Sequence, residues 1–487
     1  MSIQTPDWVK HAIFYQIYPD AFARSVPPHQ KWLLDVPLED WDAPPTYQGY
    51  KGGNLWGVID KLDYLQDLGV TALYFTPIFR SASNHRYHTH DYYQIDPLLG
   101  GNEAFKILLK TAHQRGFKVV LDGVFNHASR GFFFFNDILE NGPNSPWLDW
   151  FKIEGWPLSA YDGSLPANYV SWIDYRALPQ FNHDHPAVKE YIMQVAEYWL
   201  KQGIDGWRLD VPDCIKTPGF WQEFRQRVKA INPDAYIVGE ISFDATQWLD
   251  GKQFDGVMNY PFGRATIAFI VGDRLDQTAV PSFYKPYPTL DAPDYAREIN
   301  QLLQRHPWEI QLTQLNLLDS HDTARLITMA GDDRTAVELA TLLLFTFPGT
   351  PNIFYGDEIG IQGGHEPDSR KGFPLEEKWD QATLNYHKKF IKLRQQYAAL
   401  RIGEYYTLYA QGNVYSFARI LGNEIVIICL NKGQEISTIE VTEFGDFVAI
   451  LALQPSLILY GEGVIEWGHN YLRLTLPSYS GIMMATE

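Results

Sequence analysis

The sequence predicts an α/β fold: a TIM-type (β/α)8 barrel with a subdomain inserted after the third strand, and a C-terminal antiparallel β-sandwich. Strand-like and helix-like runs alternate from Ala12 to about Leu400, which is the pattern of repeated β/α units around a parallel sheet. The strand-like runs number roughly eight, enough to close a barrel. After Leu400 the runs are short and alternating, with turn signals and no helical period, which indicates a separate antiparallel β domain.

The elements of the barrel follow one another along the chain. The run AIFYQIYPDAF at 12–22 is expected to form the first strand. Residues 55–69 carry apolar side chains at helical spacing and stop at a glycine, so a helix is expected there, followed by a strand, TALYFTPIF, at 71–79. Further helices are expected at 103–116, 187–203, 220–231 and 336–347, and further strands at 254–261 and 350–360.

The segment 128–182 interrupts this alternation, because it is rich in glycine, proline, asparagine and aromatic residues. An insertion of this length inside a compact domain commonly forms a wall or lid of a functional site, and a plain surface excursion is the alternative. The expected division is therefore a barrel domain over 1–400, which contains 128–182 as subdomain B, and a β-sandwich domain over 401–487.

The net charge, the apolar runs and the cysteine count limit which partners the protein is expected to bind and in which compartment it is expected to lie. The 58 acidic residues outnumber the 40 lysines and arginines, and the net charge of −18 argues against binding nucleic acid or an anionic membrane. No uncharged apolar run reaches the roughly 18 residues of a spanning helix, and the N-terminus does not resemble a signal peptide. With Cys214 and Cys429 as the only cysteines, no disulfide framework is expected and a reducing, cytoplasmic location fits best.

Four apolar, strand-like runs end in an acid. A continuous apolar run suits a strand that is buried on both faces, where a polar residue is tolerated only as the strand emerges. In β/α barrels the functional groups gather at the carboxyl ends of the strands. We therefore expect one convergent site built from KVVLDGVFNH at 118–127 with Asp122, GIDGWRLDVP at 203–212 with Asp210, AYIVGEI at 235–241 with Glu240, and QLNLLDSHD at 314–322 with Asp322.

These acids suit the cleavage of a glycosidic bond, which needs a proton donor at the leaving oxygen and a carboxylate at the anomeric carbon. Arg208 shares a strand face with Asp210 and is expected to keep it ionised, whereas Glu240 lies in a more apolar run and is expected to keep its proton. Asp322 is then expected to bind substrate. Three acids and an arginine also suit a magnesium site, and isolated strand-end acids are often structural, so spacing alone leaves these alternatives open.

The stretches DGVFNH, GWRLD, VGE and SHD resemble, in this order, the motifs of the α-amylase family, glycoside hydrolase family 13. Within that family the sequence is most similar to the neopullulanase, cyclomaltodextrinase and maltogenic amylase group. The likeness covers essentially the whole chain, and it is carried by PDWVKHAIFYQIYPDAFA, YKGGNLWGVIDKLDYLQDLGVTALYFTPIF, SNHRYHTHDYYQIDP and PGTPNIFYGDEIGIQGGHEPDSR. The resemblance implies a barrel, an insertion after its third strand and a C-terminal β domain.

The resemblance also implies roles for single residues. Asp210 matches the catalytic nucleophile, Glu240 the acid/base, and Asp322 the acid that binds sugar hydroxyls and distorts the ring. Asp122 is expected to support the site through hydrogen bonds. A lone histidine more often has a structural role than a functional one. Because each of the three histidines named below lies within a family motif, a functional role is expected for them here. The other substrate-binding residues that the resemblance implies are Tyr87 beneath the scissile sugar, His85, His127, Arg208 and His321 around it, and Glu366 and Arg370 at the next sugar toward the non-reducing end.

The sequence departs from the group in three respects. Typical members begin with an extra β domain that helps to form a dimer, whereas this sequence begins at the barrel, so any homodimer is expected to form without that domain. The usual Val-Ala-Asn-Glu after the nucleophile is replaced at 211–214 and an aromatic pair at 242–243, which leaves the preference between α-1,4 and α-1,6 links open. Of the calcium ligands that the resemblance implies, only Asn126 is present. Gln180 and Cys214 occupy two of the other ligand positions, and a cysteine is a poor ligand for a hard cation such as calcium. We therefore expect no essential metal and no other cofactor.

The expected function is therefore that of a retaining glycoside hydrolase. It would cleave α-1,4 glucosidic links in maltooligosaccharides, cyclodextrins, pullulan or starch-type α-glucans by double displacement. Whether it also cleaves α-1,6 links is left open by the sequence. An α-glucan transglycosylase or a branch-point debranching enzyme with the same residues is an alternative. A non-catalytic glucan-binding barrel is an alternative from another class. The expected partner is an α-glucan, with neither nucleic acid nor a membrane as a partner.

Overall fold

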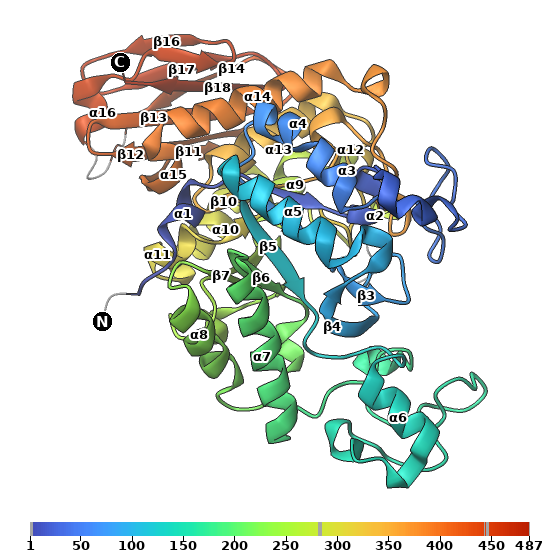
Figure 1. Ribbon diagram of the computed structural model, residues 1–487. Coiled ribbons are helices and arrows are strands. Elements are labelled where there is room, and N and C mark those ends of the chain that lie inside the picture. Colours follow the sequence, from blue (N-terminus) through green and yellow to red (C-terminus); the bar gives the residue numbers. More distant parts are fainter. Residues whose placement is uncertain (1–2, 281–284, 443, 445–447, 487) are drawn as a thin grey trace.

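The barrel is complete in the computed structural model, which describes residues 3–280, 285–442, 444 and 448–486. Parallel strands close in the order β1-β10-β9-β8-β7-β6-β5-β2, with helices around the outside (Figure 1). This confirms the predicted (β/α)8 barrel. The barrel strands are β1 Phe14–Ile17, β2 Ala72–Phe75, β5 Lys118–Gly123, β6 Gly206–Leu209, β7 Tyr236–Gly239, β8 Gly256–Asn259, β9 Leu315–Asn316 and β10 Thr350–Phe354.

The outer helices form where apolar residues recur at helical spacing. In α7 a proline, Pro186, takes the first position, where no backbone N–H is needed, and Gly203 ends the helix with a left-handed φ of 109°. None of the helices in the described ranges is long and apolar enough to cross a bilayer. The helices of the barrel are α1 Asp7–His11, α2 Pro19–Phe22, α3 Leu55–Asp60, α4 Leu62–Leu68, α5 Gly101–Gln114, α7 Pro186–Gln202, α8 Phe220–Ile231, α9 Tyr260–Ile270, α10 Ala292–Arg305, α11 Trp308–Gln311, α12 Leu326–Met329, α13 Arg334–Thr346, α14 Gln381–Gln396 and α15 Ala398–Ile402.

Several predicted elements are shorter or divided in the structure, among them the strands expected at 71–79, 254–261 and 350–360, and two further cases show the cause. The expected helix over 55–69 is divided into α3 and α4, because Lys61 between them leaves helical backbone geometry with φ −94° and ψ 1°. The expected first strand over 12–22 is paired only from Phe14 to Ile17, since Pro19 begins the helical turn α2. The sequence patterns also do not predict α9, α10 and α14, whose apolar residues are set among turn-forming and charged ones.

The inside of the barrel changes from apolar to polar along the strands. Phe14, Tyr74, Val120, Tyr236 and Met258 belong to one buried apolar cluster in the interior. Residues two positions further along a strand share its face and lie one layer nearer the carboxyl end. In that layer the strands carry the buried polar side chains Gln16, Asp122 and Arg208. The polar layer is the floor of the site described below.

The insertion lies between the end of β5 and the start of α7, as predicted. It contains one regular helix, α6 Phe133–Asn141, and projects from the barrel beyond β4 Thr89–Ile95 (Figure 1). An antiparallel bridge between His127 and Gln180 ties it to the segment that follows β5, and further bridges lie within the insertion. Ser129 N donates to Thr89 O at 3.0 Å, which joins the insertion to the hairpin formed by β3 Phe79–Ser81 and β4.

The C-terminal domain consists of two antiparallel sheets, which confirms the predicted β domain. One sheet has the order β11-β12-β13-β18-β15 and the other β14-β17-β16. Buried side chains from both sheets, such as Ile427 and Leu474, form one apolar core between them. The domain limits at 400 and 401 remain predictions. The elements are β11 Glu404–Gln411, β12 Val414–Leu421, β13 Glu424–Asn431, β14 Ser437–Val441, α16 Val448–Leu453, β15 Leu457–Tyr460, β16 Val464–Trp467, β17 Leu472–Leu476 and β18 Ser480–Ala485.

Two buried arginines meet where the barrel adjoins these sheets, and one of them, Arg419, joins the two domains directly. Arg394 of α14 donates to the carbonyl oxygen of Leu400 at 2.9 Å. Arg419 of β12 donates to the carbonyl oxygens of Thr346, Leu400 and Gly403 at 2.6, 2.8 and 2.9 Å. Burial lowers the pKa of Arg419 to about 9. The guanidinium therefore acts as a donor that satisfies carbonyls at the ends of α13 and α15.

We predict that Arg419→Met destabilises the fold. The substitution removes the arginine donor from the buried carbonyl oxygens of Thr346 and Gly403, while Leu400 O keeps Arg394, and the free energy of unfolding should fall by roughly 3 kcal/mol. Thermal unfolding of the two proteins measures the change. The control is Arg473→Met on β17, whose exposed ion pairs contribute little. Equal effects of the two substitutions would contradict the assigned role of Arg419.

Candidate active site

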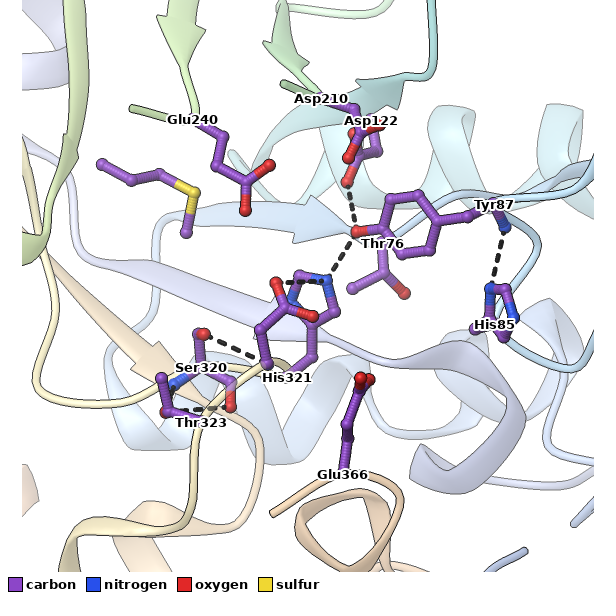
Figure 2. Close-up of polar contacts among 12 residues, drawn as sticks. Thr76, His85, Tyr87, Asp122, Asp210, Glu240, Ser320, His321, Thr323 and Glu366 are labelled. Atoms are coloured by element: carbon purple, nitrogen blue, oxygen red, sulfur yellow. Dashed lines mark hydrogen bonds and ion pairs between the residues drawn. The ribbon is translucent and has the colours of Figure 1, made fainter. Parts of the chain in front are cut away.

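Side chains from four barrel strands and their loops converge at the carboxyl end of the barrel (Figure 2). Asp122 lies near the end of β5 and Arg208 within β6, while Asp210 and Glu240 directly follow β6 and β7. The loop after β9 supplies the acid at position 322. The convergence predicted for the four acid-ended runs is therefore observed, because parallel strands in register deliver their ends to one face.

Arg208 occupies the centre of this cluster. Its Nη1 donates to both carboxylate oxygens of Asp122 at 2.9 Å and lies 3.3 Å from Asp210 Oδ1. Its Nη2 is 2.8 Å from Glu240 Oε1, an ion pair outside hydrogen-bond geometry. The guanidinium is completely buried, so its positive charge is compensated by the neighbouring carboxylates and not by water.

The backbone after β6 fixes the second carboxyl. Val211 N donates to Glu240 Oε2 at 3.3 Å. To do so Val211 adopts a left-handed backbone with φ 36° and ψ 51°, which is costly for a β-branched residue. The strain is consistent with a turn that holds Asp210 and Glu240 side by side.

Both of these carboxyls have raised pKa values. Burial raises the pKa of Glu240 to about 7, and the charges of Asp322 and Asp122 add to the rise while Arg208 opposes it. Burial, followed by the charge of Glu240, raises the pKa of Asp210 well above its usual range. Arg208 lowers the pKa of Asp210 in the expected direction, but burial and the neighbouring carboxylates outweigh it because the guanidinium is shared among three acids. The pair holds at least one proton near neutral pH.

His321 is held as a neutral ring with a defined proton. Burial lowers its pKa to about 3. Gln16 Nε2 lies 2.7 Å from its Nδ1, and because an amide nitrogen can only donate, Nδ1 accepts and Nε2 carries the hydrogen. The Nε2 atom faces the hydroxyl of Tyr87, which in turn donates to Asp122 Oδ2 at 3.1 Å (Figure 2). A chain of hydrogen bonds thus runs from β1 to β5 through the site.

Tyr87 and His85 line the same region, whereas His127 lies against the insertion. The ring of Tyr87 is parallel to that of His321, with centroids 5.6 Å apart. His85 Nδ1 accepts from Tyr87 N at 3.2 Å, and burial keeps the pKa of His85 well below its usual value. Among contacts of the described residues, His127 does not touch the Arg208 cluster, and it instead stacks on Trp172 at 5.6 Å. The structure thus brings His85 and Tyr87 together and places His127 against the insertion.

A second cluster stands opposite, on the loops after β9 and β10. Arg370 Nη2 is 3.3 Å from Asp322 Oδ1 and also pairs with Glu366, while its Nε donates to His321 O at 2.9 Å. Although burial opposes the change, the contact with His321 and the positive charge of Arg370 lower the pKa of Asp322. The side chains of Asp322 and Glu366 are 38% and 45% exposed, so both remain accessible to a ligand.

The positions expected for calcium ligands do not suit a cation. The Asn126 Oδ1 atom accepts a hydrogen bond from Gln180 Nε2 at 3.0 Å, so the two amides satisfy each other. Burial raises the pKa of Cys214 to about 11, which keeps the thiol protonated. Within the described ranges, no three His, Cys, Asp or Glu side chains are grouped as metal ligands.

The sequence reasoning missed two supporting residues. The Tyr74 hydroxyl donates to Asp122 Oδ2 at 2.9 Å from β2. Gln16 orients His321, and Asn352 Nδ2 donates to Gln16 Oε1 at 3.2 Å from β10. A signal for Gln16 exists, since it is the one polar side chain inside the apolar run AIFYQIY. No comparable signal marks Tyr74, because a tyrosine in a strand is ordinary.

A closed parallel barrel with paired carboxyls of raised pKa at its carboxyl end has the architecture of an enzyme that moves protons. The family model described as the α-amylase catalytic domain matches residues 16–390. The chain belongs to the α-amylase family and is a glycoside hydrolase of that family. This agrees with the resemblance in the sequence motifs.

Individual relatives share most of the chain. A cyclomaltodextrinase from a Bacillus species is 42% identical over 88% of this chain and 74% of its own length. Neopullulanase 2 from Thermoactinomyces vulgaris is 41% identical over 99% of this chain and 78% of its own length. The crystal structure of a debranching enzyme from Nostoc punctiforme is 64% identical, with a TM-score of 0.93 and full coverage of both chains.

We predict that Glu240→Gln stabilises the protein in a pH-dependent manner. A carboxyl whose pKa is raised by folding ionises first in the unfolded chain, so its cost to stability is absent below the unfolded pKa of 4.5, grows between that pH and about 7, and stays constant above it. The variant should gain roughly 2 kcal/mol at about pH 8 and little at about pH 5. Denaturant unfolding at both pH values measures the gain. A larger gain at the lower pH would contradict the electrostatic reading.

Proposed function

We propose that the protein hydrolyses α-1,4 and α-1,6 glucosidic links of α-glucans with retention of the anomeric configuration. The observation that carries the proposal is the meeting of Asp210 and Glu240 around Arg208, with Asp322 beside Arg370 opposite them, at the carboxyl end of an α-amylase-family barrel. Retaining glycosidases need one carboxylate to attack the anomeric carbon and one carboxylic acid to protonate the leaving oxygen. The two adjacent carboxyls, with at least one proton between them, meet that need.

In the proposed mechanism Asp210 is the nucleophile and Glu240 the acid/base. Glu240 transfers its proton to the glycosidic oxygen while Asp210 bonds to the anomeric carbon, which gives a covalent glycosyl-enzyme and releases the aglycone. Glu240, now ionised beside Arg208, then takes a proton from water, and the resulting hydroxide displaces Asp210. The 2.8 Å contact with Arg208 Nη2 supports this second step, since it stabilises the ionised form.

The remaining residues are proposed to hold the sugars. Tyr87 presents a ring beneath the scissile glucose, with His85 and His321 donating or accepting at its hydroxyls. Asp322, whose pKa is lowered, is proposed to bind hydroxyls as a carboxylate. Arg208 and Asp122 keep the carboxyls in place. The other proposed contacts are His127 on the insertion side, and Glu366 with Arg370 at the next sugar toward the non-reducing end.

The action on α-1,6 links has specific support. The relative titled as a debranching enzyme is 64% identical over the full length, compared with 41 to 42% for the neopullulanase and cyclomaltodextrinase relatives. The residues at 211–214 and 242–243 also depart from the sequences expected for the latter group. A transglycosylase would use the same covalent intermediate, with a sugar in place of water.

An α-glucan is thus the proposed partner, and an intracellular site of action is proposed with it. A relative named intracellular maltogenic amylase from Bacillus subtilis is 36% identical over 91% of this chain. Both cysteines of the chain are unpaired, which suits a reducing compartment.

The substrate proposal is tested with maltooligosaccharides, cyclodextrin, pullulan and amylopectin. The wild-type protein should release reducing sugars with the α configuration at early times, as followed by NMR. Glu240→Gln should lower turnover by about 10² to 10⁴-fold, because it removes the acid but keeps the shape. Lys378→Gln, which changes an exposed charge away from the site, is the control. Retained hydrolysis in Glu240→Gln, or products of β configuration, would exclude the mechanism, and early longer oligosaccharides would indicate transglycosylation.

The pH dependence follows from the direction of the Glu240 shift. Because the acid must be protonated in the free enzyme and its pKa is about 7, kcat/KM should fall above that pH. The expected slope is about tenfold per pH unit on the basic limb. Initial rates on a maltooligosaccharide across the neutral range measure it. A basic limb near the ordinary pKa of a glutamic acid would show that burial does not hold the proton.

A further inference from the structure

The insertion exposes large apolar side chains next to the site. Tyr161, Leu165, Ile173 and Tyr175 are 70, 55, 75 and 50% exposed. Single exposed apolar residues are normal on protein surfaces, but a group within 15 positions of one subdomain calls for an explanation. These four side chains are here termed the apolar platform.

Two arginines hold the loops of the platform together. Arg176 Nη1 donates to Ser159 O at 3.2 Å and its Nη2 to Leu165 O at 2.5 Å. The guanidinium of Arg130 lies 4.4 Å from the centre of the Tyr161 ring, and Arg130 N donates to Ala177 O at 3.2 Å. The loop at 159–165 and the turn at 172–178 therefore share one scaffold, and the platform does not depend on freely moving side chains.

The turn that carries Ile173 is strained. Ile173 has φ 44° and ψ 40°, and Asp174 follows with φ 60°. A β-branched residue in the left-handed region is a genuine outlier and costs free energy. Ile173 is 75% exposed, so burial of its side chain does not offset that cost. Strain of this kind collects at sites where a side chain must be presented to a ligand.

One end of the platform, at Tyr175, adjoins the catalytic cleft. The ring of Tyr175 lies 5.8 Å from that of His88, and His88 lies 5.0 Å from His85 in the proposed sugar site. The residue before Ile173 is Trp172, which stacks on His127. A chain bound at the carboxyls and leaving the cleft on this side would pass over the platform.

We propose that the apolar platform binds the α-glucan chain beyond the sugars held at the carboxyls, so that the enzyme favours long or polymeric glucans over short ones. This inference rests on the proposed function. Glucose rings have apolar faces that pack on tyrosine rings and aliphatic groups, and the hydroxyls around them remain in water. The continuity with His85 favours the glucan itself over a protein partner or a second copy of the chain.

The test compares substrates of two lengths. In Tyr161→Ala/Tyr175→Ala, kcat/KM on amylopectin should fall about tenfold, with a much smaller fall on maltotriose, which does not reach the platform. The matched control is Ile436→Ala, an exposed apolar residue of the C-terminal domain that is 73% exposed. Equal falls on both substrates, or no fall on amylopectin, would overturn the inference. A wild-type protein without activity on either substrate would instead remove the proposed function.

A second variant separates ligand binding from structure. Ile173→Asn introduces a residue that tolerates the left-handed backbone region, and it removes the apolar side chain that is proposed to contact the glucan. We expect its thermal midpoint to rise, because strain is relieved, while kcat/KM on amylopectin falls several-fold relative to maltotriose. Changes of the same sign in stability and long-chain activity would show that Ile173 has only a structural role. A wild-type protein that elutes as a dimer on size-exclusion chromatography, with either variant eluting as a monomer, would assign the platform to self-association and overturn the glucan proposal.

Discussion

The ion cluster around Arg208 is the constraint on which the rest of the site depends. Its guanidinium is completely buried and contacts Asp122, Asp210 and Glu240, so three acids from three neighbouring strands share one cation. Charges are expensive to bury unless their geometry and hydrogen bonds are nearly complete. The barrel supplies that geometry, because strands in parallel register bring residues far apart in sequence to the same layer. Removing Arg208 would leave several buried carboxyls with no positive partner.

Buried arginines also anchor the loops that surround the cluster. Arg86 lies between His85 and Tyr87, has φ 60°, and pairs with Asp20 at 3.3 Å, so its flanking residues are directed toward the cleft while its own side chain is buried. Arg325 pairs with Asp357 at 2.8 Å and donates to Ser369 O at 2.9 Å, which ties the loop after β9 to the loop after β10. Rigid anchors of this kind are needed when catalytic groups come from separate loops.

Stability and activity are in conflict at this site. Acids whose pKa values are raised by folding lower stability at any pH above their unfolded pKa, and the left-handed Val211 and Ile173 add backbone strain. The large apolar core around the barrel and the sandwich core of the C-terminal domain offset these costs. The conflict is expected in an enzyme, where a proton must be held against its ordinary tendency to leave.

The sequence by itself determined the barrel, the insertion and the β domain, because apolar periodicity reports which faces are buried. It also determined which acids would meet, since each follows an apolar run that must end at the same edge of a parallel sheet. Only the tertiary structure decided how Arg208 is shared, that Asp210 as well as Glu240 has a raised pKa, and that Gln16 and Tyr74 complete the network. The α3–α4 break and the strained turn at Ile173 were also beyond the sequence. These features depend on distances between segments far apart along the chain, and burial and charge–charge interactions cannot be evaluated until those distances are fixed.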